Sequence, residues 1–327
     1  MIKESIKFLT LSFVLTFFAA LAVIPVLRKL KAGQPILKYV ETHKNKSGTP
    51  TMGGLFFIIP AIASFYILGG NGAVSFVSVL IGTAFMAVGF LDDFIKIKLS
   101  RNEGLKAYQK IILQTAIGLF TGLYAYFNGI TVFNVPFSYK TVDLGVFTVP
   151  IVALVFVAIT NSVNLSDGLD GLCGSTTSAY LFFIGLLIYL QITVNRRIYY
   201  SVTEYENVIK LSFSLLGAIA AFLIFNVNKA KVFMGDTGSL SLGGFVGAIS
   251  VFTSNTFFIP VIGIMFVVSS ISVIVQVAVY KKKKKRVFLM APLHHHLQLS
   301  GYTETQIAYY YFILTCIFGL ISIIIYL

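Results

Sequence analysis

Carboxylates and imidazoles concentrate in four short polar stretches, each at the end of a strongly apolar segment. The stretches hold five of the twelve acidic residues and three of the four histidines: Asp92 with Asp93, Asp167 with Asp170, Asp236, and His294 to His296. Carboxylate oxygens bind hard cations such as Mg²⁺, and imidazoles move protons or bind phosphate. If the apolar segments cross a membrane in turn, all four stretches reach the same face. The pattern indicates a metal-assisted active site at a membrane surface.

Asp92 and Asp93 end the third apolar segment. A carboxylate inside lipid costs about 2.5–3.5 kcal/mol, so we expect an acidic pair only where water or a cation reaches it. Adjacent residues on a helix point about 100° apart, and the two acids therefore need not share one task. The alternative is an ordinary solvated helix end. Because a helix C-terminus favours cations, two acids there need a partner such as a metal ion, Lys96 or Lys98.

The second polar stretch runs from Asn161 to Gly171. Asn164, Asp167 and Asp170 recur at every third position, so on helical turns they would line one face. The glycines between them would let a ligand approach the backbone. The stretch has no Lys or Arg, which favours binding of a cation or a polar ligand. A plain turn rich in Asn, Asp and Gly is the alternative.

Three further stretches complete the expected site. Residues 235–239, Gly-Asp-Thr-Gly-Ser, predict a turn into a helix whose free N–H groups favour anions, while Asp236 can hold Mg²⁺. No Gly-Lys-Ser/Thr follows, so this is not a Walker A loop. Three consecutive histidines cannot all reach one metal from a regular helix, but they could bind diphosphate. The stretch from His43 to Gly54 suits phosphate contact, and the alternative is a plain helix start with Thr51 near the N-cap.

The composition indicates which elements position these groups. The chain is 57% hydrophobic and 11% charged, with a mean hydropathy of +0.88. A soluble domain cannot bury that much apolar surface, so we expect one integral-membrane domain over residues 1–327. The expected fold is all-α and polytopic, with about ten transmembrane helices. Their ranges are roughly 8–27, 52–68, 73–91, 108–127, 148–163, 175–193, 207–226, 239–256, 258–280 and 304–326.

The distribution of basic residues orients these helices. With the N- and C-termini outside, only six of the 25 Lys and Arg residues lie outside, which makes the basic loops cytoplasmic under the positive-inside rule. The first segment, followed by Arg28 and Lys29, fits a retained helix rather than a signal peptide. Outside, residues 129–148 predict a small β-hairpin. The placement of most Lys and Arg residues in cytoplasmic loops accounts for the net charge of +13. We therefore expect no binding of nucleic acid.

Two smaller features concern partners and redox state. Lys281 to Lys285 with Arg286 form the only low-complexity run. The run fits a membrane anchor that also contacts anionic lipid headgroups, and the alternative is attraction of an anionic substrate. Cys173 and Cys316 are the only cysteines, expected at the inner face and inside the last helix. We therefore expect no disulfide.

Five segments, in order along nearly the whole chain, resemble the signature segments of bacterial phospho-N-acetylmuramoyl-pentapeptide-transferases. They are Gly-Thr-Pro-Thr-Met-Gly-Gly (48–54), Leu-Asp-Asp (91–93), Asn-Leu-Ser-Asp-Gly-Leu-Asp-Gly (164–171), Val-Phe-Met-Gly-Asp-Thr-Gly-Ser (232–239) and Ala-Pro-Leu-His-His-His (291–296). A wider superfamily, which moves other N-acetylhexosamine 1-phosphates to polyprenyl phosphate, shares the acidic segments. The first and last segments point to the muramoyl-pentapeptide branch. One departure is that Leu297-Gln298 stands where the family commonly has Phe-Glu.

The resemblance implies a reaction and a setting. UDP-N-acetylmuramoyl-pentapeptide (UDP-MurNAc-pentapeptide) and undecaprenyl phosphate would give lipid I and UMP, with Mg²⁺, in peptidoglycan biosynthesis. The enzyme would be a homodimer in the bacterial cell membrane, with ten helices and an active site facing the cytoplasm. Its ninth helix would break near residues 281–296 and lie against the membrane.

The resemblance also assigns roles to residues of this chain. Asp236 would hold the metal, and Asp92 or Asp93, with Asp92 as the candidate base, would deprotonate or orient the lipid phosphate. Phosphates would be steadied by Lys46, Thr51, Lys96 and His294. Nucleotide and sugar contacts would come from Asn164, Asp167, Asp170, Asn226 and Phe233. Gln276 would touch uracil, with a helix-packing hydrogen bond as the alternative. Gly235, Ala291, His295 and His296 complete the expected substrate-binding set.

Two rival functions are open at this point. A sibling transferase would use UDP-N-acetylglucosamine in place of the muramoyl-pentapeptide nucleotide. An ion-coupled transporter would place its acids near the bilayer midplane, on broken helices in related halves. Here the acids lie at the ends of apolar segments on one side, and the sequence has no matching halves. An enzyme therefore fits the sequence better than a transporter.

Overall fold

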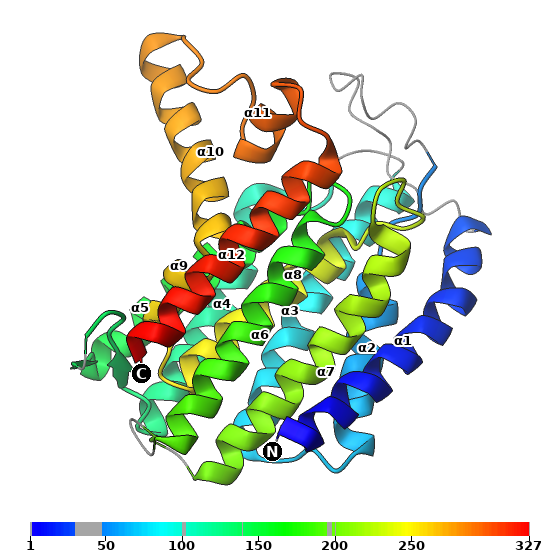
Figure 1. Cartoon of the computed structure of the whole chain (residues 1–327). Helices are drawn as coiled ribbons and strands as arrows, with labels where there is room; N and C mark the ends of the chain where they lie inside the picture. The colour runs from blue at the N-terminus through cyan, green and yellow to red at the C-terminus, as the bar shows by residue number, and fades with distance from the viewer. Residues whose placement is uncertain are drawn as a thin grey trace.

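The computed structural model describes residues 2–29, 48–99, 103–138, 140–194, 198–199 and 201–326. Lys46 lies outside these ranges. The described part is almost entirely helical, and the long helices run side by side as one bundle (Figure 1). The elements are α1 (Ile2–Lys29), α2 (Gly54–Ile67), α3 (Ala73–Lys98), α4 (Ala107–Phe127), β1 (Val132–Asn134), β2 (Thr141–Asp143), η2 (Gly145–Phe147), α5 (Thr148–Leu165), α6 (Leu172–Thr193), α7 (Val202–Asn226), α8 (Gly235–Phe252), η3 (Thr256–Phe258), α9 (Ile259–Ile262), α10 (Ile264–Lys283), α11 (Leu293–Leu299) and α12 (Glu304–Tyr326).

Eight helices of the described part are long and apolar enough to cross a membrane. The protein is therefore a polytopic membrane protein, as predicted, but two of the ten expected spans do not meet this requirement. The span expected at 52–68 is the 14-residue α2. The span expected at 239–256 is α8, which is rich in Gly and Ser and buried along almost its whole length. Since protein rather than lipid surrounds α8, its composition is set by close packing.

The core of the bundle forms around α8, which packs along α3. Glycines allow the two helices to approach closely: a Cβ on Gly82 would clash with the ring of Phe245, and a Cβ on Gly89 would clash with the backbone of Asp236. The hydroxyl of Ser241 donates to the carbonyl of Gly82 at 2.9 Å. The close approach at Gly89 brings the end of α3, which carries the acidic pair, against the start of α8.

The predicted β-hairpin is present. Val132, Phe133 and Asn134 of β1 pair antiparallel with Asp143, Val142 and Thr141 of β2. The hairpin lies toward the same end of the bundle as both chain termini, whereas α11 and the far end of α10 lie at the opposite end (Figure 1). Cys173 and Cys316 are both free, as predicted.

The expected span at 258–280 is interrupted at Gly263, which separates α9 from α10. From there α10 leans away from the bundle toward its basic end (Figure 1). The helix ends at Lys283, because Lys284 adopts the left-handed conformation with φ 54°. The chain then folds back and forms α11. The break that the resemblance implied near residues 281–296 is therefore observed.

Candidate active site

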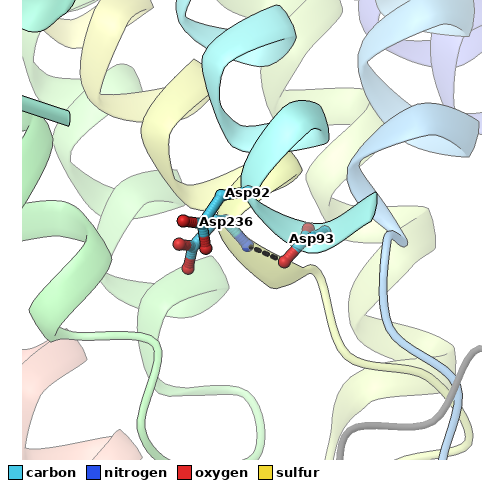
Figure 2. A group of neighbouring side chains, drawn as sticks. All are labelled: Asp92, Asp93 and Asp236. Carbon is cyan, nitrogen blue, oxygen red and sulfur yellow. Dashed lines mark hydrogen bonds between the residues drawn. The ribbon is translucent and has the colours of Figure 1, made fainter. Parts of the chain in front are cut away.

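The carboxylate of Asp93 binds the N-terminus of α8. Its Oδ1 accepts the backbone N–H of Asp236 at 3.2 Å, drawn as a dashed line in Figure 2. Its Oδ2 accepts the backbone N–H and the hydroxyl of Thr237 at 2.9 and 2.7 Å. Helix N-termini carry unpaired N–H groups and a partial positive charge, which stabilise a carboxylate. The prediction that these N–H groups are free for a ligand is therefore wrong for Asp236 and Thr237, because Asp93 is already the bound anion.

Asp92 points away from Asp93, to the side where the Asp236 carboxylate lies (Figure 2). Its Oδ1 accepts the backbone N–H of Leu105 at 2.7 Å. The side chain is fully buried. Position 104 needs a glycine, because a Cβ on Gly104 would press on the carboxylate of Asp92. The connection between α3 and α4 thus closes over Asp92. The two carboxylates therefore point in different directions, and a division of tasks between them stays a prediction.

Two lysines join the carboxylates of Asp92 and Asp236. The Nζ of Lys96 lies 2.6 Å from Asp92 Oδ2 and 3.2 Å from Asp236 Oδ2. The Nζ of Lys110 lies 3.0 Å from Asp92 Oδ1 and 2.6 Å from Asp236 Oδ2. The lysine side chains are 14% and 22% exposed, so this network is reached from solvent on the lysine side. It is a compact arrangement of opposite charges that can receive phosphate oxygens.

Lys110 was absent from the residues predicted for the site. It lies in the first turn of α4, four positions after Lys106, and looked like one of several basic residues that set topology. A short connection between antiparallel helices brings the start of α4 to the end of α3. This connection is the sequence feature that could have placed Lys110 near the acidic pair. Lys98, the second lysine proposed to stabilise the acids, instead lies over the ring of Phe94 at 6.0 Å.

Oxygen atoms of Asp92, Asp93 and Asp236 lie within 4.8 Å of one another. Such a set of carboxylate oxygens fits Mg²⁺, which proteins bind through one or two carboxylates together with phosphate oxygens and water. Asp93 already accepts three hydrogen bonds from α8. Asp92 and Asp236 share their cationic neighbours, so these two residues would hold the ion.

The segment before α2 pairs with the segment before α8. The backbone N–H of Phe233 donates to Pro50 at 2.8 Å, and the N–H groups of Gly53 and Gly54 donate to the carbonyls of Phe233 and Met234 at 2.9 and 3.0 Å. Two signature segments far apart in the sequence are thus bound side by side. The side chain of Phe233 is only half-buried.

Thr51 is held within this pairing. It is not the N-cap of α2, which is Gly53. Its side chain is buried, and its hydroxyl has no hydrogen-bond partner among the residues that the structure describes. Gly235, with φ 69°, lies directly against it, because a Cβ there would press on both Asp93 and Thr51. An L side chain rarely adopts that φ, so glycine serves here both for backbone shape and for space.

The expectation that Asn164, Asp167 and Asp170 share one helical face is wrong. α5 ends at Leu165, and the chain turns through Gly171, with φ 75°, into α6. Asn164 Nδ2 donates to Asp236 Oδ1 and to Ser239 Oγ, both at 2.8 Å. Asp170 Oδ2 instead accepts the backbone N–H of Ala230 at 3.0 Å. Asn164 is therefore brought into the acidic site, and Asp170 fixes the connection between α7 and α8.

Asp167 lies in the turn between these two residues. Its burial raises the pKa of its carboxyl well above the usual range, and the negative charges of Asp236 and Asp93 raise it further. Asn226, at the end of α7, uses both ends of its amide: Oδ1 accepts from the N–H of Gly171 at 3.1 Å, and Nδ2 donates to the carbonyl of Val232 at 2.9 Å. Asn226 thus shapes the loops around the site.

His294 is fully buried at the start of α11. Its ring centroid lies 4.4 Å from that of His295 and 6.4 Å from that of Tyr311. Gly168 provides space for it, since a Cβ on Gly168 would clash with Nε2 of His294. The second and fourth polar stretches therefore meet at this point, as predicted.

The three histidines have different neighbours. His295 Nδ1 lies 3.3 Å from Gln298 Oε1. His296 Nδ1 accepts the backbone N–H of Leu289 at 3.2 Å. Only His294 is buried among these three.

Gln276 binds the loop that follows α10. Its Oε1 accepts the backbone N–H groups of Val287 and Phe288 at 2.9 and 3.0 Å, and its Nε2 donates to the carbonyl of Phe288 at 3.2 Å. The predicted helix-packing hydrogen bond of Gln276 is therefore wrong in its partner, which is the backbone of a loop and not another helix. Ala291 lies in the same loop, just before α11. Contact of Gln276 or Ala291 with the nucleotide stays a prediction.

Comparison with known proteins identifies the family. The model of Glycosyl transferase family 4 matches residues 75–254, and phospho-N-acetylmuramoyl-pentapeptide-transferase signature 1 matches residues 46–58.

Proteins named phospho-N-acetylmuramoyl-pentapeptide-transferase are similar along almost their whole length. The protein of Clostridium novyi (strain NT) is 39% identical over 321 residues, which cover 96% of this chain and 95% of that protein. The protein of Clostridioides difficile (strain 630) is 40% identical over 304 residues, with 92% and 91% covered. The protein of Halalkalibacterium halodurans is 36% identical over 321 residues, with 96% and 95% covered. The chain belongs to the phospho-N-acetylmuramoyl-pentapeptide-transferase family.

Proposed function

We propose that this protein transfers phospho-N-acetylmuramoyl-pentapeptide from UDP-MurNAc-pentapeptide to undecaprenyl phosphate, giving lipid I and UMP in peptidoglycan synthesis. Support comes from relatives named for this transfer, which match more than nine-tenths of the chain. The structural observation that carries the proposal is the sharing of Lys96 and Lys110 between Asp92 and Asp236. A reaction between two phosphates needs such concentrated positive charge beside a group that can accept a proton.

The proposed reaction exchanges one phosphoanhydride bond for another. An oxygen of the lipid phosphate attacks the phosphorus that carries the sugar, the bond from this phosphorus to the oxygen of UMP breaks, and UMP leaves with that oxygen. Asp92 would take the proton from the lipid phosphate or orient it. Lys96 and Lys110 would reduce the repulsion between the two anionic reactants and stabilise the charge that develops on UMP.

We propose Mg²⁺ as the cofactor, held by Asp236 and Asp92. The bound ion would neutralise the negative charge of the diphosphate and the charge that develops on the leaving UMP. Support comes from the oxygen-only donor set and its burial beneath two lysines. Thr51, with its buried hydroxyl directed toward Gly235, and His294, buried beside Gly168, are proposed to steady phosphates together with Lys46.

The decisive experiment uses the purified full chain in detergent with polyprenyl phosphate and either UDP-MurNAc-pentapeptide or UDP-N-acetylglucosamine. We expect UMP release with the first nucleotide, loss of release with a chelator, and recovery when Mg²⁺ is added back. A preference for UDP-N-acetylglucosamine would make this protein the sibling transferase. Substrate flux in proteoliposomes without formation of UMP would favour a transporter.

We also propose that the site faces the cytoplasm and that the protein is a homodimer. The positive-inside distribution of Lys and Arg supports the orientation. Cysteines introduced at the exposed positions Lys229 and Asp143, after replacement of the two native cysteines, would test it with an impermeant reagent. Lys229→Cys should react only from the cytoplasmic side and Asp143→Cys only from outside. The mass of the purified protein, corrected for detergent, tests the dimer.

A further inference from the structure

The basic run at the far end of α10 has no part in the active site described above. We call Lys281 to Lys285 together with Arg286 the basic tip. All six side chains are exposed. The sequence has no acidic residue from Thr237 to Thr303, so no carboxylate within this stretch balances the charge. The region between Gly263 and Gly301 therefore presents six positive charges at and just after the end of α10, a helix that leans away from the bundle (Figure 1).

The residues before the basic tip place it at a membrane surface. α10 is one of the eight helices long and apolar enough to cross a membrane. Ile271, Ile274 and Val277 are 51%, 65% and 47% exposed and follow one another at three-residue spacing, so they form a lipid-facing stripe. Tyr280 follows at the position where aromatic rings mark the interface. The basic tip comes immediately after it, at the depth of the lipid headgroups.

The residues after the basic tip return toward the apolar layer. Gln276 binds the backbone of Val287 and Phe288, so the chain doubles back along α10 by about two turns. Val287 and Leu289 are 49% and 51% exposed. Exposed apolar side chains therefore precede and follow the basic tip along the chain. Both sets lie on the side of the basic tip that faces the membrane. A soluble anionic ligand would gain nothing from these exposed apolar groups, whereas a lipid surface satisfies both kinds of side chain.

We propose that the basic tip and its apolar flanks, Val277, Tyr280, Val287 and Leu289, form a binding surface for anionic phospholipid headgroups of the bilayer. Lysine stems lie along the acyl boundary while their ammonium groups reach headgroup phosphates. One basic residue near an anionic surface strengthens association about fivefold. The surface therefore surrounds α10 with anionic lipid, next to the loop that leads to α11.

The test measures lipid selectivity and needs no turnover, so its outcome is independent of the proposed function. The full chain is reconstituted in phosphatidylcholine bilayers with 20% phosphatidylglycerol. Association of spin-labelled phosphatidylglycerol is then compared with that of spin-labelled phosphatidylcholine. We expect wild-type protein to prefer the anionic lipid at least threefold and to lose most of the preference in 0.5 M salt. Replacement of Lys281 to Lys285 by Gln should bring the ratio close to one.

Two matched variants complete the test. Replacement of the same five lysines by Arg keeps the charge and should keep the preference. The variant Lys98→Gln, Lys229→Gln, Lys231→Gln removes exposed charges elsewhere and should also keep it. If the five-Gln variant does not elute as a single species, the double variant Lys281→Gln, Lys282→Gln should give a partial loss. An unchanged ratio in the Gln variants, or an equal loss with the charges removed elsewhere, would overturn the proposal. So would a raised KM for the nucleotide substrate with unchanged lipid selectivity, because the basic tip would then serve the soluble substrate.

Discussion

Asp92 and Asp93 are adjacent in the sequence, yet their carboxylates accept hydrogen bonds from different backbone groups, and the ammonium group of Lys96 lies 2.6 Å from Asp92 Oδ2 but 3.9 Å from Asp93 Oδ1. Asp93 accepts three hydrogen bonds from the first turn of α8. Asp92 lies between the ammonium groups of Lys96 and Lys110 and shares both with Asp236. Asp93 therefore helps to fix the position of Asp236, while Asp92 and Asp236 are the residues that we propose to face the reactants. Substitutions at the three positions should consequently differ in their effects on stability.

Asp93→Asn should nearly abolish turnover and also lower the thermal unfolding temperature. The amide keeps an acceptor but loses the charge that favours the N-terminus of α8, and hydrogen bonds to charged groups contribute about 1.5–3 kcal/mol each. The fold itself should persist, because α3 and α8 also pack through Gly82 and Ser241. Unfolding followed by intrinsic tyrosine fluorescence, together with UMP release, measures both effects.

Asp236→Asn should nearly abolish turnover with little change in unfolding temperature, since Lys96 and Lys110 both keep Asp92 as a partner. The matched control is Asp143→Asn in the exposed hairpin, which should change neither quantity. Wild-type turnover in Asp93→Asn or Asp236→Asn would remove that residue from the active site. Equal loss of stability in both would contradict the division of roles between them.

Lys110→Gln should reduce kcat by at least tenfold, because it removes one of the two cations shared by Asp92 and Asp236. Lys98→Gln is the control: this lysine lies in the same helix two residues after Lys96, on a different face, and its ammonium group lies over the ring of Phe94. Steady-state measurement of UMP release at saturating substrate separates the two variants. A wild-type kcat in Lys110→Gln would show that the lysine sets topology alone.

Much of this fold could be predicted from hydropathy and charge. The hairpin at residues 132–143, the helix at the first apolar segment and the gathering of the polar stretches at one end are all observed. Two of the expected spans, α2 and α8, differ from the other eight. α2 has 14 residues, and α8 is rich in Gly and Ser and is buried by protein along almost its whole length. The lower hydropathy of α8 therefore follows from its central position, where it packs against protein and not against lipid.

The composition of the site was predicted better than its geometry. The spacing of Asn164 and Asp170 predicted one helical face, but α5 ends at Leu165 and the chain turns through Gly171 into α6. The anion at the N-terminus of α8 was predicted to be a ligand, and it is the side chain of Asp93. The local sequence of Lys110 did not distinguish it from the lysines that set topology, and only the short connection between α3 and α4 places it near the acids. Each failure concerns a contact between residues distant in the sequence.

Gly89→Ala tests the close approach of α3 to α8. A Cβ at this position would clash with the backbone carbonyl of Asp236, which cannot move without moving the site. Overpacking of this kind costs about 1–3 kcal/mol, so both the unfolding temperature and kcat should fall. Gly185→Ala in α6 is the matched control, because its nearest neighbour would be the ring of Phe213 at 3.5 Å, an ordinary contact. Equal behaviour of the two variants would contradict the close packing of α3 on α8.

Tyr311→Phe tests how His294 is positioned. The hydroxyl of Tyr311 lies 3.1 Å from Ser269 Oγ of α10, and the backbone of His294 hydrogen-bonds to the same hydroxyl. The substitution keeps the ring that packs on His294 and removes only these polar contacts. If His294 steadies a phosphate, we expect kcat to fall about fivefold with KM little changed, as for a loss of roughly one hydrogen bond.

A double-mutant cycle separates this role from a general loss of stability. In a His294→Gln background, Tyr311→Phe should cause no further loss of kcat, because the residue it positions is already absent. Ser269→Ala should reproduce part of the effect of Tyr311→Phe, since it removes the other partner of the hydroxyl. A full and additive loss in the His294→Gln background would mean that the hydroxyl acts on turnover by a route that does not include His294.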